Sequence, residues 1–154
     1  YEKWIVEDVI NVVKEQILGR ALPLFITGLS MGGYGALRLG AKYSNKFQAF
    51  SGHSSVTEVG QLSQFMEDFE GFIASVKIQE SVLESLLKNE SNLSPFRFDC
   101  GNEDILIESN RQLHQALIKH QIAHSYDEFS GGHEWAYWEK HIIDSLLFFG
   151  SFCR

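Results

Sequence analysis

The chain has 154 residues, of which 44% are hydrophobic and 13% aromatic, which is enough apolar material for one globular domain with a core. This composition excludes a disordered or collagen-like chain. The net charge of -7 and the pI of about 5.3 argue against nucleic acid as a partner, because no cluster of Lys and Arg is present to displace phosphate counterions. No apolar run is long enough to span a bilayer, so the sequence indicates no membrane partner.

Two cysteines, Cys100 and Cys153, are too few for a disulfide framework. Cys100 ends an apolar segment, where a small buried residue with a free thiol is expected, and a free thiol is typical of a reducing compartment such as the cytoplasm. No signal peptide is visible, but the chain begins at Tyr1 without a methionine. The sequence therefore leaves the compartment unknown.

The first predicted elements are a helix, a strand and a second helix. Apolar residues recur at helical spacing and stop before Gly19, which predicts an amphipathic helix that ends at this glycine. Its apolar face is made of Val6, Val9, Ile10, Val13 and Ile17. Residues 22–27 then predict a buried strand, and residues 31–43 predict the helix that follows it.

Three further strands are predicted at residues 47–51, 95–100 and 125–129, which run up to Gly52, Gly101 and the pair at 131–132. A helix is predicted over residues 105–120, and a last helix carries one apolar face. That face is made of Trp135, Trp138, Ile142, Leu146 and Phe149. Because helices separate the strands, the sequence predicts βαβ crossovers and a parallel sheet, which is the α/β fold class.

Residues 57–93 form one long insertion between the second and third predicted strands, with helical periodicity and an aromatic portion at residues 65–73. These aromatic side chains either bury the insertion against the body of the protein, or they roof the site like a lid and line an acyl or aryl pocket. We therefore expect a single domain over residues 1–154 that carries a helical, lid-like insertion.

Residues 24–33 are the most informative stretch, because a β-branched and aromatic run stops at Ser30 with Gly28 and Gly32 two residues away on each side. This pattern is typical of a nucleophile elbow, in which a strand passes abruptly into a helix, glycines relieve the crowding and the serine hydroxyl is exposed. The following helix points its first N–H groups at the reaction centre, so we expect the Met31 N–H to donate to an oxyanion. An ordinary glycine-rich turn is the alternative.

The residue types needed for nucleophilic catalysis fall at the carboxyl edge of the predicted sheet, where ligands of such sheets bind. Ser30 follows the first strand, the pair Glu103 and Asp104 follows the third, and His133 follows the fourth. A histidine can take the serine proton, and a carboxylate then fixes the imidazole. The order serine, acid, histidine is that of α/β-hydrolases. We prefer Asp104 to Glu103 as the acid, with a helix N-cap as the alternative role for Asp104.

Three further residues at this edge, Leu29, His53 and Trp135, are candidates for the substrate pocket, and a turn role is the alternative for His53. A metal site is not expected, because His133 and Glu134 lack the second histidine that a zinc protease places at helical spacing, and no Cys-x-x-Cys occurs. The mechanism requires no cofactor, so none is expected. The expected partner is a small ester or thioester.

Three motifs together resemble the esterase family of α/β-hydrolases that includes S-formylglutathione hydrolases, feruloyl and acetyl-xylan esterases, tributyrin-type carboxylesterases and mycolyltransferases. The motifs are Gly-Leu-Ser-Met-Gly-Gly-Tyr-Gly-Ala-Leu at residues 28–37, Cys-Gly-Asn-Glu-Asp at residues 100–104, and Gly-Gly-His-Glu-Trp at residues 131–135 with Trp138. The resemblance covers nearly the whole chain. It implies Ser30 as nucleophile, Asp104 as acid, His133 as base and Met31 as an oxyanion-hole donor through its backbone N–H.

The same resemblance maps the chain onto the carboxyl-terminal half of the fold, because family members have several strands and another oxyanion-hole loop upstream. We therefore expect these upstream strands to be missing and the first strand to lie at a bare, apolar edge that invites pairing into a homo-oligomer. The sequence predicts a serine carboxylesterase, with S-formylglutathione hydrolase and acyltransferase as competitors within the enzyme class. A noncatalytic binding or assembly module on a truncated hydrolase fold is the alternative.

Overall fold

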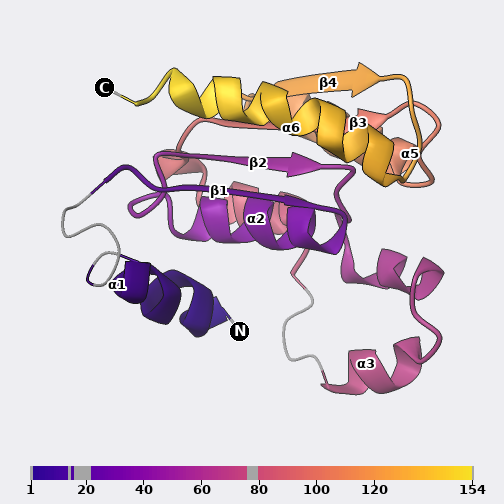
Figure 1. Cartoon of the computed structure of the whole chain (residues 1–154). Helices are drawn as coiled ribbons and strands as arrows, with labels where there is room; N and C mark the ends of the chain where they lie inside the picture. Colours follow the sequence, from indigo (N-terminus) through magenta and orange to yellow (C-terminus); the bar gives the residue numbers. More distant parts are fainter. Residues whose placement is uncertain (1, 14, 16–21, 76–79, 154) are drawn as a thin grey trace.

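A four-stranded parallel sheet forms the centre of the protein, in a computed structural model that describes residues 2–13, 15, 22–75 and 80–153. The strands are β1 (Phe25–Leu29), β2 (Ala49–His53), β3 (Phe96–Gly101) and β4 (Ser125–Phe129), and they lie side by side in this order. Their arrowheads all point the same way in Figure 1. The predicted α/β class is therefore confirmed, with β1 at one edge of the described sheet.

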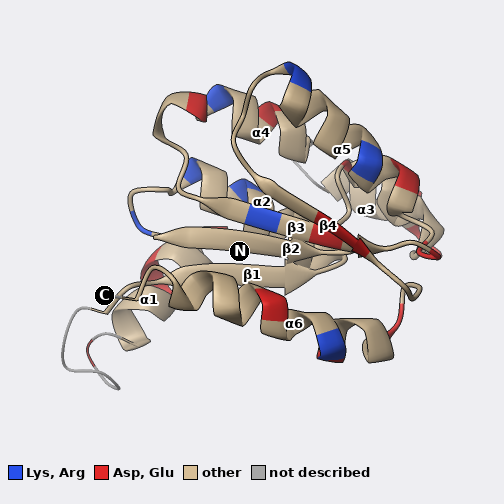
Figure 2. Cartoon of the chain, turned by 90° about the horizontal axis from the view of Figure 1, so that it is seen from above, with Lys and Arg blue, Asp and Glu red and all other residues tan. Residues whose placement is uncertain are grey.

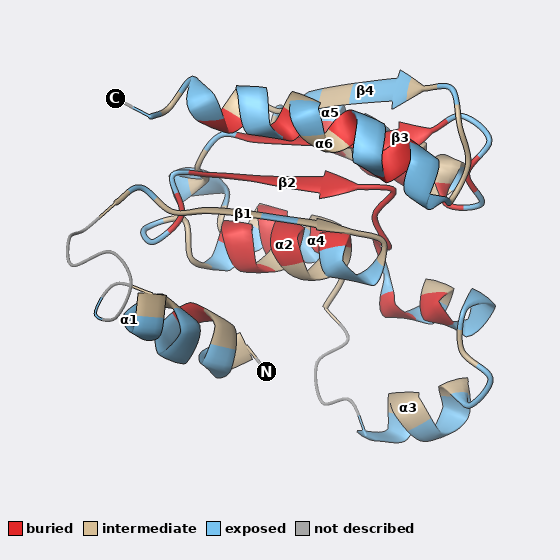
Figure 3. Ribbon diagram, viewed as in Figure 1, coloured by how far each residue is buried: buried red, intermediate tan, exposed pale blue. Residues whose placement is uncertain are grey.

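Helices cover both faces of this sheet. In Figure 2, α2, α4 and α5 lie on one side of the strands and α6 lies on the other. The helices are η1 (Trp4–Val9), α1 (Ile10–Val12), α2 (Met31–Lys42), η3 (Val59–Gln64), α3 (Phe69–Ser75), α4 (Val82–Lys88), η4 (Glu90–Asn92), α5 (Ile107–Lys119) and α6 (Trp135–Gly150). Because both faces are covered, β2 and β3 are buried along their full length, as Figure 3 shows.

The first three strands begin and end later than their sequence patterns predict, whereas β4 matches its predicted bounds. We expected β1 and β2 to stop before Gly28 and Gly52, but these two glycines pair with each other within the ladder. The pairing continues to Leu29 opposite His53, and His53 also pairs with Asp99 on β3. The strands therefore end where their pairing partners end, and β1 runs directly into Ser30.

The amino-terminal helix is wound differently from the prediction. Its η1 part is a π-helix, which has more residues per turn than an α-helix, so residues predicted to share one face are rotated apart. Val6 is buried against Leu39 of α2 and Phe47, whereas Val9, predicted on the same face, is exposed. Two further residues of that prediction, Ile17 and Gly19, lie outside the described residues.

The buried face of α6 also differs from the predicted apolar stripe. Trp138 and Phe149 are buried as predicted, but Trp135 and Leu146 are exposed. Polar side chains fill the remaining buried positions, namely Tyr137, His141 and Ser145. A hydrophobicity pattern cannot anticipate this face, because Tyr137 and Ser145 hydrogen-bond to side chains of the sheet and His141 stacks on Phe129 of β4.

The main core lies between the sheet and the helices α2, α4 and α5. Phe50 and Phe96 stack with their ring centroids 4.8 Å apart and are both buried. Burial of such a side chain contributes about 1.5–3 kcal/mol. The helix α2 approaches the sheet closely at Gly40, where a Cβ atom would lie 2.2 Å from the Phe50 ring. This contact fixes α2, and hence its amino terminus, against the sheet.

The aromatic portion of the insertion packs on a small apolar cluster that joins it to the body of the protein at Leu106. Four apolar side chains of its aromatic portion contact the buried cluster Val56, Val59, Leu62 and Leu106; they are Met66, Phe69, Phe72 and Ile73. Phe65 is not among them, because its ring lies beside His133. Among the helices of the described residues, none combines the length and the apolar character needed to cross a membrane.

Candidate active site

Ser30 joins β1 to α2 in a strained backbone conformation, with φ 53° and ψ -121°. Such a conformation costs a non-glycine residue about 1–3 kcal/mol and persists only where the surroundings enforce it. The Ser30 N–H donates to the His53 carbonyl over 2.9 Å, and the Ser30 carbonyl accepts from the N–H groups of Tyr34 and Val56, each over 3.1 Å. Three backbone hydrogen bonds therefore hold the turn: one to α2 and two to the end of β2 and the residues after it.

The two glycines that flank Ser30 have different reasons to be glycine. A Cβ atom at Gly28 would lie 2.3 Å from the Gly32 carbonyl oxygen, so a side chain there would block the turn. A Cβ atom at Gly32 would meet nothing within 4 Å. Gly33 is the second crowded position, because its Cβ atom would lie 2.3 Å from Ser55 Oγ. The expectation that both flanking side chains would collide is therefore wrong for Gly32, whose backbone is the obstacle for Gly28.

The structure brings Ser30, His133 and Asp104 together in one hydrogen-bonded array. His133 Nε2 lies 2.9 Å from Ser30 Oγ, and His133 Nδ1 lies 3.0 and 3.1 Å from the two Asp104 oxygens. These distances fit the tautomer in which the Ser30 hydroxyl donates to Nε2 and the Nδ1–H donates to the carboxylate. Glu103, the rival acid, is exposed to solvent.

Asp104 is 2% exposed, and its environment decides its charge. Burial by itself raises the pKa of Asp104, but hydrogen bonds from His133 and from the Leu106 N–H outweigh burial, so the pKa lies below its usual range. The Leu106 N–H donates to Asp104 Oδ1 over 2.8 Å. Asp104 is therefore ionised at neutral pH, and the N-cap-like contact accompanies the contact with His133 instead of replacing it.

Aromatic rings surround the His133 imidazole. The Phe65 ring, from the insertion, lies 5.0 Å from it, and the Trp138 ring lies 4.9 Å from it on the α6 side. Trp135 in turn contacts Trp138 edge to face, with ring centroids 5.4 Å apart. The imidazole thus contacts two aromatic side chains, and the His133 side chain keeps 15% exposure.

Four large apolar side chains face solvent in segments that carry or contact the members of the array. Phe65 is 40% exposed, Met31 56%, Ile105 58% and Trp135 68%. Met31 follows Ser30, Ile105 follows Asp104, and Trp135 lies two residues after His133. We call these four residues the apolar rim. Exposed apolar side chains that gather around polar groups are typical of a ligand-binding surface.

The three residues expected to line a pocket lie in different surroundings. Trp135 belongs to the apolar rim, and Leu29 is half-buried at the end of β1. His53 is only 2% exposed, and its ring nitrogens contact Asp99 and Ser145 instead of open space. The expectation that His53 lines the pocket is therefore wrong, because a side chain enclosed by protein partners offers no surface to a ligand.

A buried polar network surrounds His53, which the sequence patterns did not predict. Arg97 and Asp99 are buried in β3, although charged residues that alternate with phenylalanines are typical of a strand with one face in solvent. That alternation was the signal in the sequence from which a polar network on one face of β3 could have been predicted. Its polar face is covered by α6, whose Tyr137 and Ser145 supply the partners. In the part of the chain that the structure describes, no three His, Cys, Asp or Glu side chains gather as metal ligands.

Similar proteins carry this fold and include esterases. An acetyl esterase from Caldicellulosiruptor saccharolyticus is 33% identical over 139 residues, which are 79% of this chain and 52% of the relative. The crystal structure of S-formylglutathione hydrolase (FrmB) from Staphylococcus aureus is 25% identical with a TM-score of 0.83, and the match covers 96% of this chain and 63% of that one. The serine hydrolase FphF from Staphylococcus aureus, described as fluorophosphonate-binding, is 26% identical with a TM-score of 0.80 over 96% of this chain and 62% of that one.

The chain thus spans about half the length of the acetyl esterase and about three fifths of the solved structures that it matches. Its residues 1–149 match the family described as "Putative esterase". Because this match extends over nearly all of the chain and the sheet has the α/β-hydrolase architecture, the chain belongs to this esterase family of α/β-hydrolases.

Proposed function

We propose that this protein is a serine carboxylesterase that cleaves its substrate through an acyl-enzyme on Ser30. The observation that carries the proposal is His133, whose two ring nitrogens contact Ser30 Oγ and the buried Asp104 carboxylate. A serine hydroxyl is a weak nucleophile until a base takes its proton. The strained turn at Ser30 and the family membership support the same assignment.

In the first half-reaction, Ser30 Oγ attacks the ester carbonyl carbon while His133 Nε2 takes the hydroxyl proton. The new Oγ–carbon bond forms as the carbonyl π electrons move onto oxygen, which becomes an oxyanion. Collapse of this intermediate breaks the bond to the alcohol oxygen, and His133 returns its proton to the departing alcohol. Asp104 stabilises the imidazolium between these two transfers and stays ionised itself.

In the second half-reaction, water takes the place of the alcohol. His133 accepts a proton from the water as the hydroxide adds to the acyl carbon. Collapse then breaks the bond between Ser30 Oγ and the acyl carbon, His133 returns the proton to Oγ, and the acid is released. The Met31 N–H, the first of α2, supports the oxyanion in both halves, since helix N-termini carry unsatisfied donors and a partial positive charge.

The surroundings of Ser30 favour an uncharged ester with an apolar group. The apolar rim offers hydrophobic contact, and Phe65 offers an aromatic ring beside His133. Glu103 and Glu134 are exposed neighbours of Asp104 and His133, so an anionic substrate would be repelled. An acetyl ester of a neutral alcohol combines a small acyl group with these features. Phe65 is the residue through which we propose that the insertion acts as a lid.

The test of the mechanism is the intact mass of the protein after exposure to a fluorophosphonate. We expect one adduct on the parent, no adduct on Ser30→Ala, and an unchanged adduct on Ser63→Ala, a matched exposed serine on η3. Parent protein without an adduct, or an adduct that survives in Ser30→Ala, contradicts the proposal. Ligand binding without any reaction would instead support a noncatalytic module.

The test of the substrate class compares a neutral aryl acetate with S-formylglutathione, an anionic thioester. We expect a higher kcat/KM for the aryl acetate, and the difference should shrink in Glu103→Gln and Glu134→Gln because like-charge repulsion is removed. A preference for the thioester in the parent would identify an S-formylglutathione hydrolase instead. Transfer of the acetyl group to an added sugar in place of water would identify an acyltransferase.

A further inference from the structure

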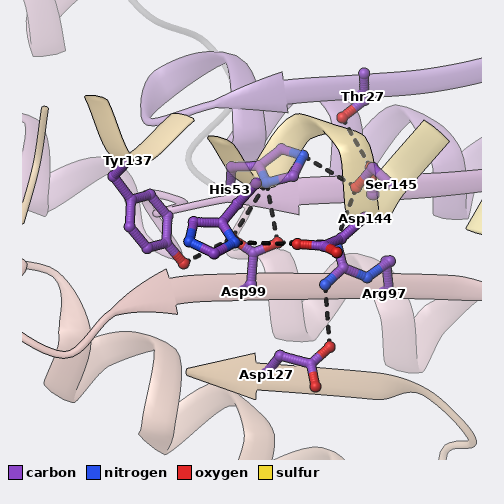
Figure 4. A network of polar contacts seen from close by, with 10 residues as sticks. Thr27, His53, Arg97, Asp99, Asp127, Tyr137, Asp144 and Ser145 are labelled. Atoms are coloured by element: carbon purple, nitrogen blue, oxygen red, sulfur yellow. Dashed lines mark hydrogen bonds and ion pairs between the residues drawn. The ribbon is translucent and has the colours of Figure 1, made fainter. Parts of the chain in front are cut away.

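A second polar cluster lies beside the sheet on the side of α6, and Asp99 is at its centre (Figure 4). The Asp99 carboxylate, on β3, is fully buried and accepts three hydrogen bonds. Arg97 Nη1 donates over 2.9 Å, His53 Nδ1 lies 2.9 Å away, and the Tyr137 hydroxyl donates over 2.9 Å. This buried charge is therefore fully satisfied by protein partners.

The cluster repeats the Ser–His–Asp pattern of the candidate active site. Ser145 Oγ lies 3.0 Å from His53 Nε2, and His53 Nδ1 contacts Asp99. However, Arg97 Nη1 also donates to Ser145 Oγ over 3.0 Å, and Ser145, His53 and Asp99 are at most 2% exposed. No substrate can reach this hydroxyl, so the cluster is not a second nucleophile.

Each partner of Asp99 belongs to an element that contacts, or lies next in the chain to, one member of the candidate active site. His53 ends β2, and its carbonyl accepts the Ser30 N–H over 2.9 Å. The Asp99 carbonyl in turn accepts the Ser54 N–H over 2.8 Å, which fixes the chain immediately after His53. The chain runs from Asp99 on β3 to Asp104, three residues beyond the end of the strand, within five residues. The carboxylate is thus tied both to the turn at Ser30 and to the segment of the acid.

The third connection leads to His133. Tyr137, in the first turn of α6, lies four residues after His133 and donates its hydroxyl to Asp99. Gly131 packs against the same ring, since a Cβ atom there would lie 2.9 Å from Tyr137 Cδ2. The loop that carries His133 therefore packs against the Tyr137 ring through Gly131, and the Tyr137 hydroxyl is in turn bound to Asp99.

We infer that Asp99 is a positioning residue that fixes Ser30, Asp104 and His133 relative to one another through His53, β3 and Tyr137. This inference rests on the proposed function, because positioning matters only if these three residues react. A displacement of about 1 Å in an active site can lower the rate by about 100-fold. One buried carboxylate bonded to all three supporting elements is suited to prevent such a displacement.

The test measures how fast a fluorophosphonate labels Ser30 in Asp99→Asn, which keeps the shape and removes the charge. We expect the maximal labelling rate to fall about 100-fold, with the half-saturating concentration unchanged. Tyr137→Phe removes only one hydrogen bond and should lower the rate about tenfold. Asp127→Asn is the matched control. Asp127 also contacts Arg97, but its side chain is 49% exposed and, in the ion pairs that Arg97 forms, it makes no contact with the Asp99 carboxylate.

Each labelling rate is divided by the folded fraction of that variant, which is measured by urea denaturation. A loss of stability alone is then not mistaken for a slower reaction of the folded protein. Parent-like rates for the folded fraction of both Asp99→Asn and Tyr137→Phe would overturn the inference. If Asp99→Asn does not fold, Tyr137→Phe decides alone. An equal loss in Asp127→Asn would also overturn it, because the effect would then belong to Arg97 and not to Asp99.

An NMR measurement separates this inference from the proposed function. The parent should show a slowly exchanging Ser30 amide, from its bond to His53, and a downfield His133 Nδ1–H signal, from its bond to Asp104. Asp99→Asn should speed the amide exchange and shift or broaden the imidazole signal. If the parent reacts with no fluorophosphonate, the proposed function fails, and these two signals still decide whether Asp99 positions the array.

Discussion

Two Ser–His–Asp arrays with nearly equal hydrogen-bond lengths lie in this protein, one at the carboxyl edge of the sheet and one buried under α6. The serine-to-histidine distances are 2.9 Å for Ser30 with His133 and 3.0 Å for Ser145 with His53. The histidine-to-carboxylate distances are 3.0 and 2.9 Å. Hydrogen-bond geometry within the three residues therefore does not distinguish an array that can react from one that supports the fold.

The surroundings make the distinction. Ser30 stands in a strained turn at the start of a helix, where the next N–H groups have no intrahelical partner and can bind an oxyanion. Ser145 stands inside α6, where the backbone groups are used by the helix, and Arg97 donates to its hydroxyl. A nucleophile needs access for the substrate, free N–H donors nearby and an unoccupied lone pair on its oxygen. Of these two serines, only Ser30 meets these conditions.

The largest expected effect is that of Ser30→Ala. We expect turnover of an aryl acetate to fall on the order of 10⁶-fold, to the level left by binding and the oxyanion donor alone. The measurement is steady-state hydrolysis, with repurified protein to exclude contamination. Activity within tenfold of the parent would show that the array at the sheet edge is not the reacting one.

Asp104→Asn should lower kcat about 10⁴-fold, because the amide can hold His133 in the wrong tautomer while the geometry stays intact. Glu103→Gln is the matched control, since Glu103 is the adjacent, exposed acid and should change kcat for a neutral ester less than about threefold. Steady-state kinetics of both variants decide between the two acids. A larger loss in Glu103→Gln would assign the role to Glu103.

Phe65→Ala should lower kcat/KM for an aryl acetate about tenfold and affect a short alkyl acetate less, because one aromatic contact contributes about 0.5–1.5 kcal/mol. Ile118→Ala, an exposed apolar residue on α5, serves as the control for loss of apolar surface. Equal changes for the aryl and alkyl esters would show that Phe65 does not contact the aryl group.

Ser145→Ala should leave the labelling rate of Ser30 within about threefold of the parent but reduce the free energy of unfolding by about 1–3 kcal/mol, since His53 and Arg97 each lose a buried partner. Urea denaturation and fluorophosphonate labelling of the same sample provide both values. A collapse of labelling without a change in stability would mean that the buried array takes part in the reaction.

The smallest effect concerns the pH dependence of stability. The pKa of Asp104 is lowered in the folded protein, so its contribution is complete above about pH 4, near the unfolded value, and is lost as the pH falls through the folded pKa. Urea denaturation of the parent and of Asp104→Asn at pH 7, 5 and 3 should show a smaller loss in the variant at the lowest pH. Parallel losses would contradict the lowered pKa.

The sequence by itself determined the features that depend on neighbouring residues. The spacing of Gly28 and Ser30 after an apolar run specifies a strand that turns into a helix, because a side chain at Gly28 would collide with the turn. The alternation of strands and helices specifies a parallel sheet, and the order Ser30, Asp104, His133 follows from where those strands end.

Tertiary structure alone decided which partners meet across long separations. Ser30 and His133 lie 103 residues apart, and the choice of Asp104 over Glu103 depends on which side chain faces the imidazole. Likewise, Asp99 acquires its partners because α6 covers its side of β3 with Tyr137 and Ser145. A linear pattern cannot give these contacts, because each one depends on which elements pack together and which face they present.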